Sequence, residues 1–301
     1  MSNFRMAWMA AAIFSLSSAQ LQHQASAQGA SAQAAEAQRI ISIGGDVTEI
    51  IYALGVSDRV VAVDSSSQFP PEALRDKKSV GYMRTLAPEG VLSVGADLIV
   101  ASDRAGPADI VQVLKTAGRY VEVPEGNSPE GVMQKIKAVA KAVGKVEEGD
   151  ALARSVEDDF AALRRDRKAV TKPLRALFIL NVVNGRATVG GSGTSADAIL
   201  KLAAIDNAAA SITGFKPVGD EALIEMRPDI VVTMKRVAGA GHDAAQIWSL
   251  AGLQKTPAAA DRRMVEMDGQ YLLGFGPRVA SAARDLMRAA YPMGPATSAT
   301  R

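Results

Sequence analysis

The chain has 301 residues, of which 48% are hydrophobic and 22% are charged, so it is long enough for two domains with buried cores. Its 34 basic and 32 acidic residues nearly balance, which argues against a nucleic-acid-binding protein and against intrinsic disorder. Cysteine is absent and histidine occurs only at His23 and His242, so disulfides, thiolate chemistry and a site of several histidines from one chain are excluded.

The first 27 residues have the organisation of a secretory signal peptide. Arg5 precedes an apolar run from Met6 to Ala19, and Ala25-Ser26-Ala27 is a small-residue cleavage site before Gln28. The run is shorter than the ~20 residues that cross a bilayer, so a membrane anchor is the weaker interpretation. We expect cleavage near Ala27, export to the periplasm without a lipoprotein anchor, and a flexible leader at residues 28–38.

The first half of the body alternates short apolar strands with helices. Strands are expected at 39–43, 60–63, 98–101 and 120–123, and helices at 47–54, 88–94 and 109–117. Asp46 is predicted to cap the first of these helices and Gly55 to end it. Such alternation is typical of parallel strands covered by helices, so residues 39–126 are expected to form an N-terminal lobe.

The second half follows the same plan. Strands are expected at 175–183, 229–234 and 264–267, and helices at 195–204 and 242–251. The segment from Glu89 to Val100 aligns without gaps with the segment from Glu221 to Val232, an offset of 132 residues (221 − 89). We interpret the chain as two lobes built on one plan, with residues 173–292 as the C-terminal lobe and 293–301 as a flexible tail.

Residues 127–172 are expected to form a helical linker region between the lobes. The stretches 129–143 and 147–168 carry apolar residues at helical spacing. A helix of about 20 residues reaches ~30 Å. A single crossing of this kind predicts an α/β fold of two Rossmann-like lobes with parallel sheets, joined by one long rigid helix, with a ligand cleft between the lobes.

Two enzymatic interpretations fit the sequence poorly. Ser192 lies in Gly190-Gly-Ser-Gly193, which does not satisfy the G-x-S-x-G motif of hydrolases, and nothing pairs it with His242. The stretch from Gly191 to Ala196 matches G-x-G-x-x-A, but it comes late in its lobe and lacks the acidic residue that would follow a dinucleotide site. A turn at the N-terminus of a helix is the simpler interpretation.

Tyr82 differs in its surroundings from the other tyrosines, which are Tyr52, Tyr120, Tyr271 and Tyr291. It lies in a loop rich in positive charge, between Gly81 and Arg84, just before a predicted helix. A nearby cation favours the phenolate, which suits ferric iron, and haem iron can be held by tyrosine. On these grounds alone, an exposed loop tyrosine without a function remains the alternative.

Several stretches around these residues carry a resemblance. They are Val80-Gly-Tyr-Met-Arg84 with its continuation to Ser93, the stretch 191–198, Gly214-Phe-Lys-Pro217, and the stretch 267–278. Together they resemble the periplasmic haemin-binding proteins of ABC importers, over residues 39–292. The Gly-Tyr-x-Arg loop separates haemin binders from relatives that carry cobalamin, siderophores, zinc or manganese. The resemblance implies two α/β lobes with haem in the cleft between them.

The resemblance also implies roles for individual residues. Tyr82 would be the axial ligand of the haem iron, and Arg84 would bond the phenolate or a propionate. Further candidates for the haem pocket and its propionates are Arg104, Lys235, Arg236 and Tyr271. His242 follows the strand at 229–234, where the internal repeat places the start of the cleft loop, and is either a possible second ligand or only the cap of a helix. Some relatives hold two stacked haems through a histidine of the second lobe. Residues 181–193 contain no histidine, which argues against that binding mode here.

Glu89 and Glu221 occupy equivalent positions in the aligned segments. They resemble the carboxylates with which the family docks onto the two permease subunits. The alternative is that each glutamate only meets the dipole of the helix it begins.

We therefore expect an exported, monomeric carrier that binds haem b (haemin) without chemistry and delivers it to an inner-membrane ABC permease dimer, with no nucleic-acid partner. The alternatives are a siderophore or cobalamin carrier and, from another class, an extracytoplasmic α/β enzyme. Optical absorption after haemin addition discriminates among them, because only the first hypothesis predicts a Soret band.

Overall fold

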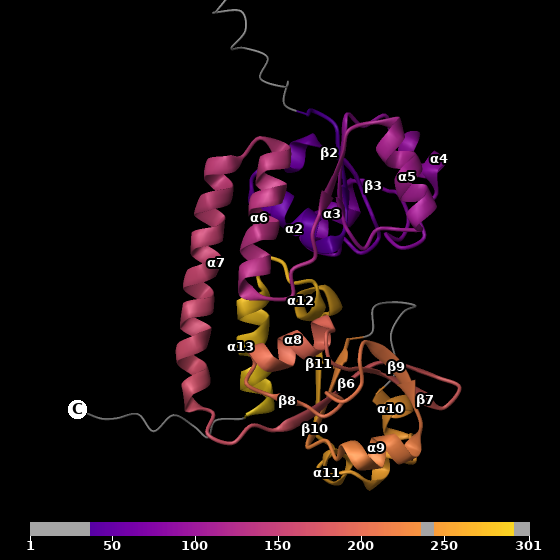
Figure 1. Cartoon of the computed structure of the whole chain (residues 1–301), viewed down its shortest axis with the longest axis vertical. Coiled ribbons are helices and arrows are strands. Elements are labelled where there is room, and N and C mark those ends of the chain that lie inside the picture. Colours follow the sequence, from indigo (N-terminus) through magenta and orange to yellow (C-terminus); the bar gives the residue numbers. More distant parts are fainter. Residues whose placement is uncertain (1–36, 236–243, 292–301) are drawn as a thin grey trace, which may run out of the picture. The chain divides into compact units, whose positions relative to one another are not determined.

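Two sheets organise the protein, whose computed structural model describes residues 37–235 and 244–291 (Figure 1). The N-terminal lobe has a five-stranded sheet in the order β3-β2-β1-β4-β5, and every strand pair in it is parallel. Its strands are β1 (Ile40–Ile43), β2 (Val60–Val63), β3 (Lys78–Ser79), β4 (Leu98–Ser102) and β5 (Tyr120–Val123). Its helices are α2 (Gly45–Ala53), η1 (Ser57–Arg59), α3 (Pro71–Asp76), α4 (Pro88–Leu92) and α5 (Ala108–Ala117).

The C-terminal lobe has a six-stranded sheet in the order β11-β10-β6-β7-β9, with β8 paired to β6. Its strands are β6 (Arg175–Val183), β7 (Arg186–Gly190), β8 (Asp206–Asn207), β9 (Phe215–Val218), β10 (Ile230–Met234) and β11 (Met264–Met267). Its helices are α8 (Ser195–Leu202), α9 (Asp220–Met226), α10 (Ala244–Trp248), η3 (Leu253–Lys255), α11 (Pro257–Ala260), α12 (Gly269–Leu273) and α13 (Val279–Ala290). The two-lobe α/β fold is as predicted.

The second sheet is mixed, so the prediction of parallel strands needs correction there. β7 pairs antiparallel with both β6 and β9, and neither β7 nor β9 is among the predicted strands. The reason is a hairpin: Asn184 and Gly185 join β6 to β7 with positive φ angles of 52° and 72°. Two consecutive positive φ angles are what a tight two-residue hairpin turn requires.

The internal repeat is visible in atomic detail at the start of each sheet. Asp97 accepts backbone hydrogen bonds from Gln38 and Arg39 at the start of β1, at 2.9 and 3.0 Å. Asp229, the aligned residue of the second lobe, accepts one from Arg175 at the start of β6, at 2.8 Å. In both lobes the backbone N–H of the aspartate bonds back to the same strand, at Arg39 and Arg175 respectively. The duplicated segment therefore makes equivalent strand contacts in the two lobes, β4 with β1 and β10 with β6.

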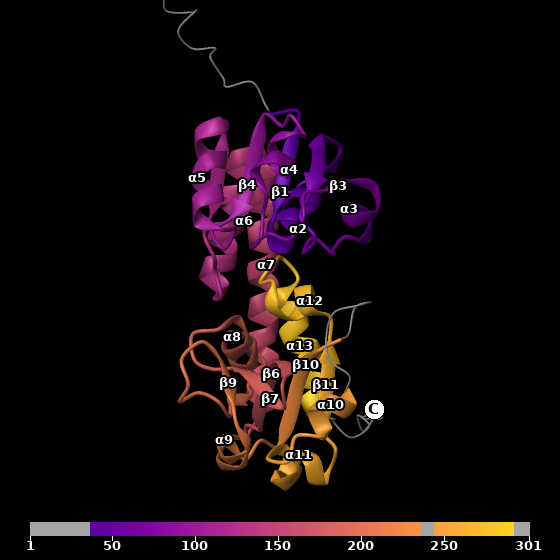
Figure 2. The same cartoon turned by 90° about the vertical axis from the view of Figure 1, so that its right-hand side faces the viewer.

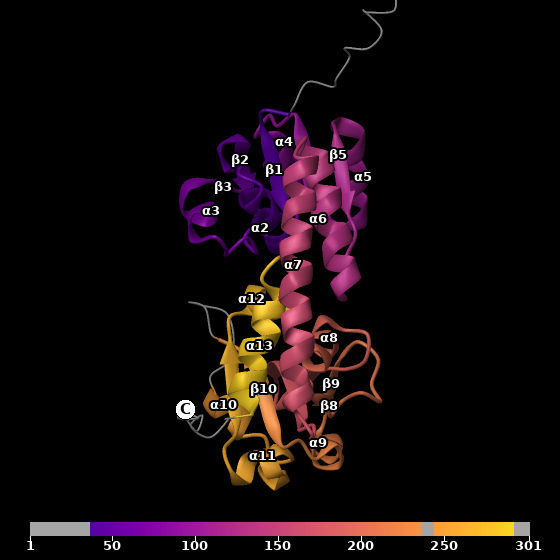
Figure 3. The ribbon, with the colours of Figure 1, turned by 90° about the vertical axis from the view of Figure 1, so that its left-hand side faces the viewer.

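Two antiparallel helices follow the N-terminal sheet. α6 (Pro129–Val143) begins at Ser128, whose side chain accepts from the N–H of Gly131, and ends at Gly144 with a φ of 76°. α7 (Val146–Asp166) has 21 residues and runs beside both lobes (Figure 3). Its buried side includes Val156, Phe160 and Leu163, which recur at helical spacing.

A helix near the C-terminus of the chain forms hydrogen bonds with the N-terminal lobe. The side-chain amide of Gln270, in α12, donates to the carbonyl of Gly45 at 2.7 Å and accepts from the N–H of Phe69 at 2.8 Å. α12 lies at the junction of the lobes in both views (Figure 1 and Figure 2). The apolar core is continuous from β1 through α6 and α7 to α13. The lobes are therefore connected by side-chain contacts as well as by α7.

Asp46 does not cap α2, so that prediction is wrong. The capping position is Gly44, and Asp46 lies in the first turn, where its carboxylate forms an ion pair with Lys135 of α6. Lys135 is only 1% exposed and also donates to the carbonyl of Phe275 at 3.3 Å. A buried lysine requires such partners, so the carboxylate is committed to a tertiary contact.

Candidate ligand-binding site

A cavity of about 380 Å³ lies between the lobes, within the size range of small-molecule sites. The N-terminal lobe contributes polar and charged side chains, among them Asp46, Ser66, Gln68, Tyr82, Arg84 and Arg104. The C-terminal lobe contributes mainly apolar ones, among them Leu180, Phe215, Met234 and Leu273, together with Lys235. Four of the predicted site residues, Tyr82, Arg84, Arg104 and Lys235, thus line one cavity.

The loop that presents Tyr82 is anchored by a buried side chain at every third position. Val80, Met83 and Leu86 are buried, whereas Tyr82 is 46% exposed. The carbonyl of Tyr82 accepts from the N–H of Thr85 at 2.9 Å, which closes a turn. Gly81 has a φ of 90°, in a region that other residues rarely adopt. The loop therefore presents its phenol to the cavity from a fixed backbone.

Asp64, directly after β2, holds the loops around the cavity together. This fully buried carboxylate accepts from the N–H of Gly44 at 2.7 Å and from the N–H of Ser66 at 2.8 Å. It also accepts from the hydroxyl of Ser67 at 3.0 Å and from the N–H of Met83 at 3.3 Å. One side chain thus positions three loops, including the loop of Tyr82.

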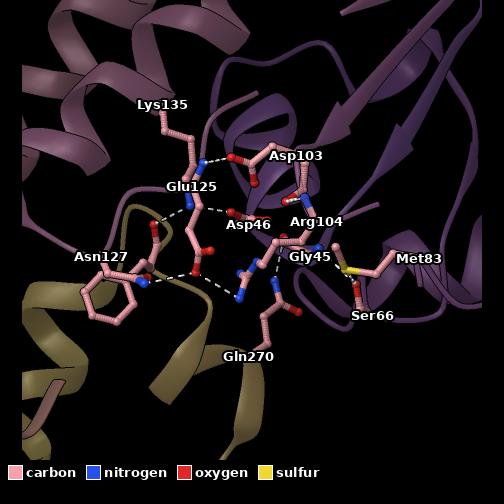
Figure 4. A network of polar contacts seen from close by, with 12 residues as sticks. Gly45, Asp46, Ser66, Met83, Asp103, Arg104, Glu125, Asn127, Lys135 and Gln270 are labelled. Carbon is pink, nitrogen blue, oxygen red and sulfur yellow. Dashed lines mark hydrogen bonds and ion pairs between the residues drawn. The ribbon is translucent and has the colours of Figure 1, made fainter. Parts of the chain in front are cut away.

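Arg104 is positioned by an acidic neighbour. Its guanidinium lies 3.0 Å from Glu125, and the same carboxylate oxygen accepts from the side chain of Asn127 at 3.0 Å (Figure 4). The N–H of Glu125 in turn donates to Asp103 at 2.7 Å. Arg104 therefore carries a cation into the cavity from a supported position.

The environments of two other tyrosines strongly disfavour a phenolate. Burial, assisted by the charge of Glu122, raises the pKa of Tyr120 to about 12. Burial and a hydrogen bond to Asp285 raise the pKa of Tyr271 to about 12. The hydroxyl of Tyr271 lies 2.9 Å from Asp285, and the residue does not line the cavity. The structure thus places Tyr271 apart from the four predicted residues that it brings together.

The remaining two tyrosines are also poor sources of a phenolate. Burial raises the pKa of Tyr52, and two nearby carboxylates add to the effect. Burial likewise raises the pKa of Tyr291, whose hydroxyl donates to the carbonyl of Ala204 at 2.7 Å. Tyr82 is therefore the tyrosine that combines exposure, a cavity and neighbouring cations.

The predicted docking pair lies away from the cavity. Glu89 and Glu221 are exposed, and each occupies the first turn of a short helix, α4 or α9. The strands that follow these helices, β4 and β10, begin at the same 132-residue offset (230 − 98). Arg236 and His242, the other predicted pocket residues, lie outside the described residues.

Three residues of the site escape the sequence analysis. Asp64 carries a weak signal, because polar residues that directly follow a parallel strand lie at the edge where ligands bind. Gln270 lies in the stretch 267–278 that carries the resemblance, but neither it nor Lys135 carries a sequence signal of its contact, because their partners Gly45 and Asp46 are distant in the sequence. Within the described residues, no cluster of three or more His, Asp or Glu side chains is arranged to hold a metal ion.

The profile of the periplasmic binding protein family matches residues 40–271. The chain belongs to this family. Members of the family bind a substrate, and the two-lobe fold with a cavity between the lobes agrees with such a role. In the described part of this binding protein, no helix has the combined length and apolar character that a membrane crossing requires.

Two solved structures show how far the similarity extends. The periplasmic haem-binding protein RhuT from Roseiflexus sp. RS-1, in its apo form, is 36% identical, with a TM-score of 0.80 over 85% of this chain and 98% of RhuT. The periplasmic haem-binding protein BhuT, in complex with two haems, is 34% identical, with a TM-score of 0.78 over 84% of this chain and 97% of BhuT.

A relative from Bacillus subtilis is described by its transport role, without a named substrate. The ABC transporter substrate-binding lipoprotein YvrC is 29% identical over 261 residues, which cover 85% of this chain and 81% of YvrC. Similarity to this binding protein therefore extends over most of both chains.

Proposed function

We propose that this periplasmic binding protein carries haem and delivers it to an inner-membrane ABC permease. The observation that carries the proposal is Tyr82, an exposed phenol at the mouth of a cavity that also holds Arg84 and Arg104. A phenolate is a suitable ligand for ferric haem iron. The likeness to RhuT and BhuT supports haem over the other cargoes of the family.

The lining of the cavity matches the two parts of haem b. Apolar side chains such as Leu180, Phe215 and Leu273 suit a porphyrin face, and arginines suit its propionates. Arg84, Arg104 and Lys235 are the propionate partners in this proposal, with Arg236 as a further candidate. His242 is a candidate second ligand of the iron. Tyr271 is a weaker candidate because its hydroxyl is bonded to Asp285.

Delivery requires export and docking. The signal peptide is proposed to be cleaved near Ala27, which releases a monomeric carrier with lobes at 39–126 and 173–292 and a linker region at 127–172. Glu89 and Glu221 are proposed to meet arginines on the two permease subunits. Their exposure and their equivalent positions in the two lobes support this role.

The proposal is tested by titrating the purified mature chain with haemin and, separately, with cobalamin and a ferric siderophore. We expect a saturable Soret band with haemin and no saturable spectral change with the other two. Saturation with cobalamin or the siderophore, but not with haemin, would show that the carrier serves the alternative cargo. We expect each ligand to be recovered unchanged, because the proposed carrier binds its ligand and catalyses no reaction on it.

A further inference from the structure

The two helices that carry the proposed docking glutamates also carry an apolar residue at the same place. On α4, Leu92 follows Glu89 by one helical turn and is 41% exposed. On α9, Ile224 follows Glu221 at the same distance and is partly exposed. The offset between the two apolar residues is again 132 (224 − 92). Residues at this spacing lie on one side of a helix, so each glutamate has an apolar neighbour at the surface.

Neither apolar side chain contributes to the core of its lobe. The residue that precedes each of them, Val91 or Leu223, is buried. Leu92 and Ile224 themselves neither belong to nor pack against the apolar clusters that the described residues form. A single exposed leucine needs no explanation, but here an apolar residue lies outside the core at the same position of two duplicated helices. The two lobes therefore share a surface property as well as a fold.

Both helices are held at their C-terminal ends in the same way. The guanidinium of Arg39, directly before β1, donates to the carbonyls of Val94 at 2.7 Å and Gly95 at 2.8 Å. The guanidinium of Arg175, at the start of β6, donates to the carbonyl of Met226 at 3.0 Å. Met226 is the residue that aligns with Val94 in the repeat. A surface that is already ordered loses less conformational freedom on binding, so both helices are suited to rigid docking.

The two helices face the same side of the molecule. Both α4 and α9 lie on the side of the lobes away from α7 (Figure 1), and both are in view when that side faces the reader (Figure 2). Neither Leu92 nor Ile224 lines the ligand cavity. A partner with two like surfaces can therefore contact both helices at once and leave the ligand in place.

We propose that Leu92 and Ile224 each enter an apolar pocket on one of the two permease subunits, beside the basic residue that meets the glutamate. The inference rests on the proposed delivery of haem to a permease dimer. A dimer of like subunits presents the same pocket twice, which matches a glutamate and an apolar residue repeated in both lobes. Charges at the rim of an interface mainly speed encounter, whereas buried apolar area opposes dissociation. The glutamates guide the carrier to the permease, and the apolar pair retains it there.

The test measures binding of the haemin-loaded mature chain to its permease in lipid nanodiscs, by surface plasmon resonance. The double variant Leu92→Gln, Ile224→Gln should dissociate at least about 10-fold faster than the wild type. Its association rate should change by less than about 2-fold. In contrast, Glu89→Gln with Glu221→Gln should mainly slow association, by an amount that decreases as salt is added.

A matched control replaces two other exposed apolar residues, Leu74 of α3 and Val146 of α7. Leu74→Gln with Val146→Gln should leave both rates unchanged. The haemin affinity and the urea denaturation midpoint of the Leu92→Gln, Ile224→Gln variant should equal those of the wild type, because these side chains lie outside the cavity and the core. A faster dissociation of this variant is then an effect on the interface alone.

Three results would overturn the proposal. Dissociation of the Leu92→Gln, Ile224→Gln variant at the wild-type rate would remove the apolar pair from the interface. Equal acceleration in the control variant would show that the position of the apolar residues is irrelevant. A wild-type dimer in sedimentation that the first variant converts to monomers would assign the pair to a second copy of this chain. Failure of the proposed delivery is distinct from these outcomes, because the wild type would then bind haemin without binding the permease, or bind no haemin at all.

Discussion

Arg278 forms two side-chain hydrogen bonds with Glu49 across the junction of the lobes, from Nε to Oε1 at 3.0 Å and from Nη2 to Oε2 at 2.9 Å. The guanidinium also stacks on the ring of Phe69, 3.3 Å from its centroid. Planar pairing of arginine with a carboxylate is geometrically specific. The pair therefore fixes the position of the start of α13 against α2.

Removing Arg278 should destabilise the protein strongly. The side chain of Glu49 is only 6% exposed and that of Arg278 is 31% exposed, so Arg278→Ala leaves a buried carboxylate without its cation. We expect a loss of about 3 kcal/mol in the free energy of unfolding, measured by urea denaturation. Arg288→Ala, which removes an exposed arginine 3.6 Å from Asp285, should cost less than about 0.5 kcal/mol. Equal losses in the two variants would contradict the prediction.

Asp64→Asn should disturb the cavity as well as the stability of the fold. The amide places N–H donors where the N–H groups of Ser66 and Met83 now meet a carboxylate. We expect a loss of about 2 kcal/mol in the free energy of unfolding and weaker haemin binding, because the loop of Tyr82 loses its support. Asp58→Asn, at an exposed position of η1, is the control. An unchanged denaturation midpoint for Asp64→Asn would refute this role.

The features that the sequence predicts are those determined by neighbours in the chain. The strands β1, β4, β6 and β10 are short apolar runs, and the repeat at the 132-residue offset (221 − 89) places Glu89 and Glu221 in equivalent helices. The Tyr82 loop is identified by its local glycine and arginine. Local composition is therefore sufficient to identify the loop that carries Tyr82 and Arg84, which line the cavity.

The features that it misses have two different physical origins. The β6–β7 hairpin does carry a local signal, the Asn184-Gly185 pair that favours a tight turn, and the expectation of parallel strands overlooks it. Arg278 with Glu49 and Gln270 with Phe69 are separated by 229 and 201 residues. Contacts of this range depend on the packing of the lobes, which periodicity does not encode.

Stability should fall in alkaline solution because of two tyrosines. The pKa values of Tyr120 and Tyr271 are raised in the fold to about 12, from an ordinary value of 10.0. Between pH 10 and pH 12 the unfolded chain releases these protons while the folded chain keeps them. The free energy of unfolding therefore decreases as the pH rises through this range. Below pH 10 the contribution is constant. In urea denaturation across this range, Tyr271→Phe should lose stability less steeply than the wild type, and parallel curves would contradict the assignment.

Glu89 and Glu221 should act in delivery and leave haem affinity unchanged. Both are exposed and lie outside the ligand cavity, and charges at the rim of an interface act mainly on encounter and docking. Reversal of both, Glu89→Lys with Glu221→Lys, should slow permease-dependent haem uptake at least about 10-fold. Glu225→Lys, compared with Glu221→Lys alone, is the matched control on the same helix. Normal uptake by the double variant would remove the docking role.

Tyr82→Phe isolates the iron ligand from the rest of the pocket. The substitution removes the phenolic oxygen and keeps the ring, and because Tyr82 is 46% exposed the fold should be unaffected. We expect the charge-transfer band of a ferric tyrosinate to disappear and haemin to bind more weakly, since no other described tyrosine lines the cavity. Tyr271→Phe removes a phenol bonded to Asp285 and should keep the wild-type spectrum. Arg84→Ala should weaken haemin binding less than Tyr82→Phe does, because it removes a propionate partner and leaves the iron ligand in place. If Tyr82→Phe retained the wild-type spectrum while Tyr271→Phe lost it, the ligand would lie in the C-terminal lobe.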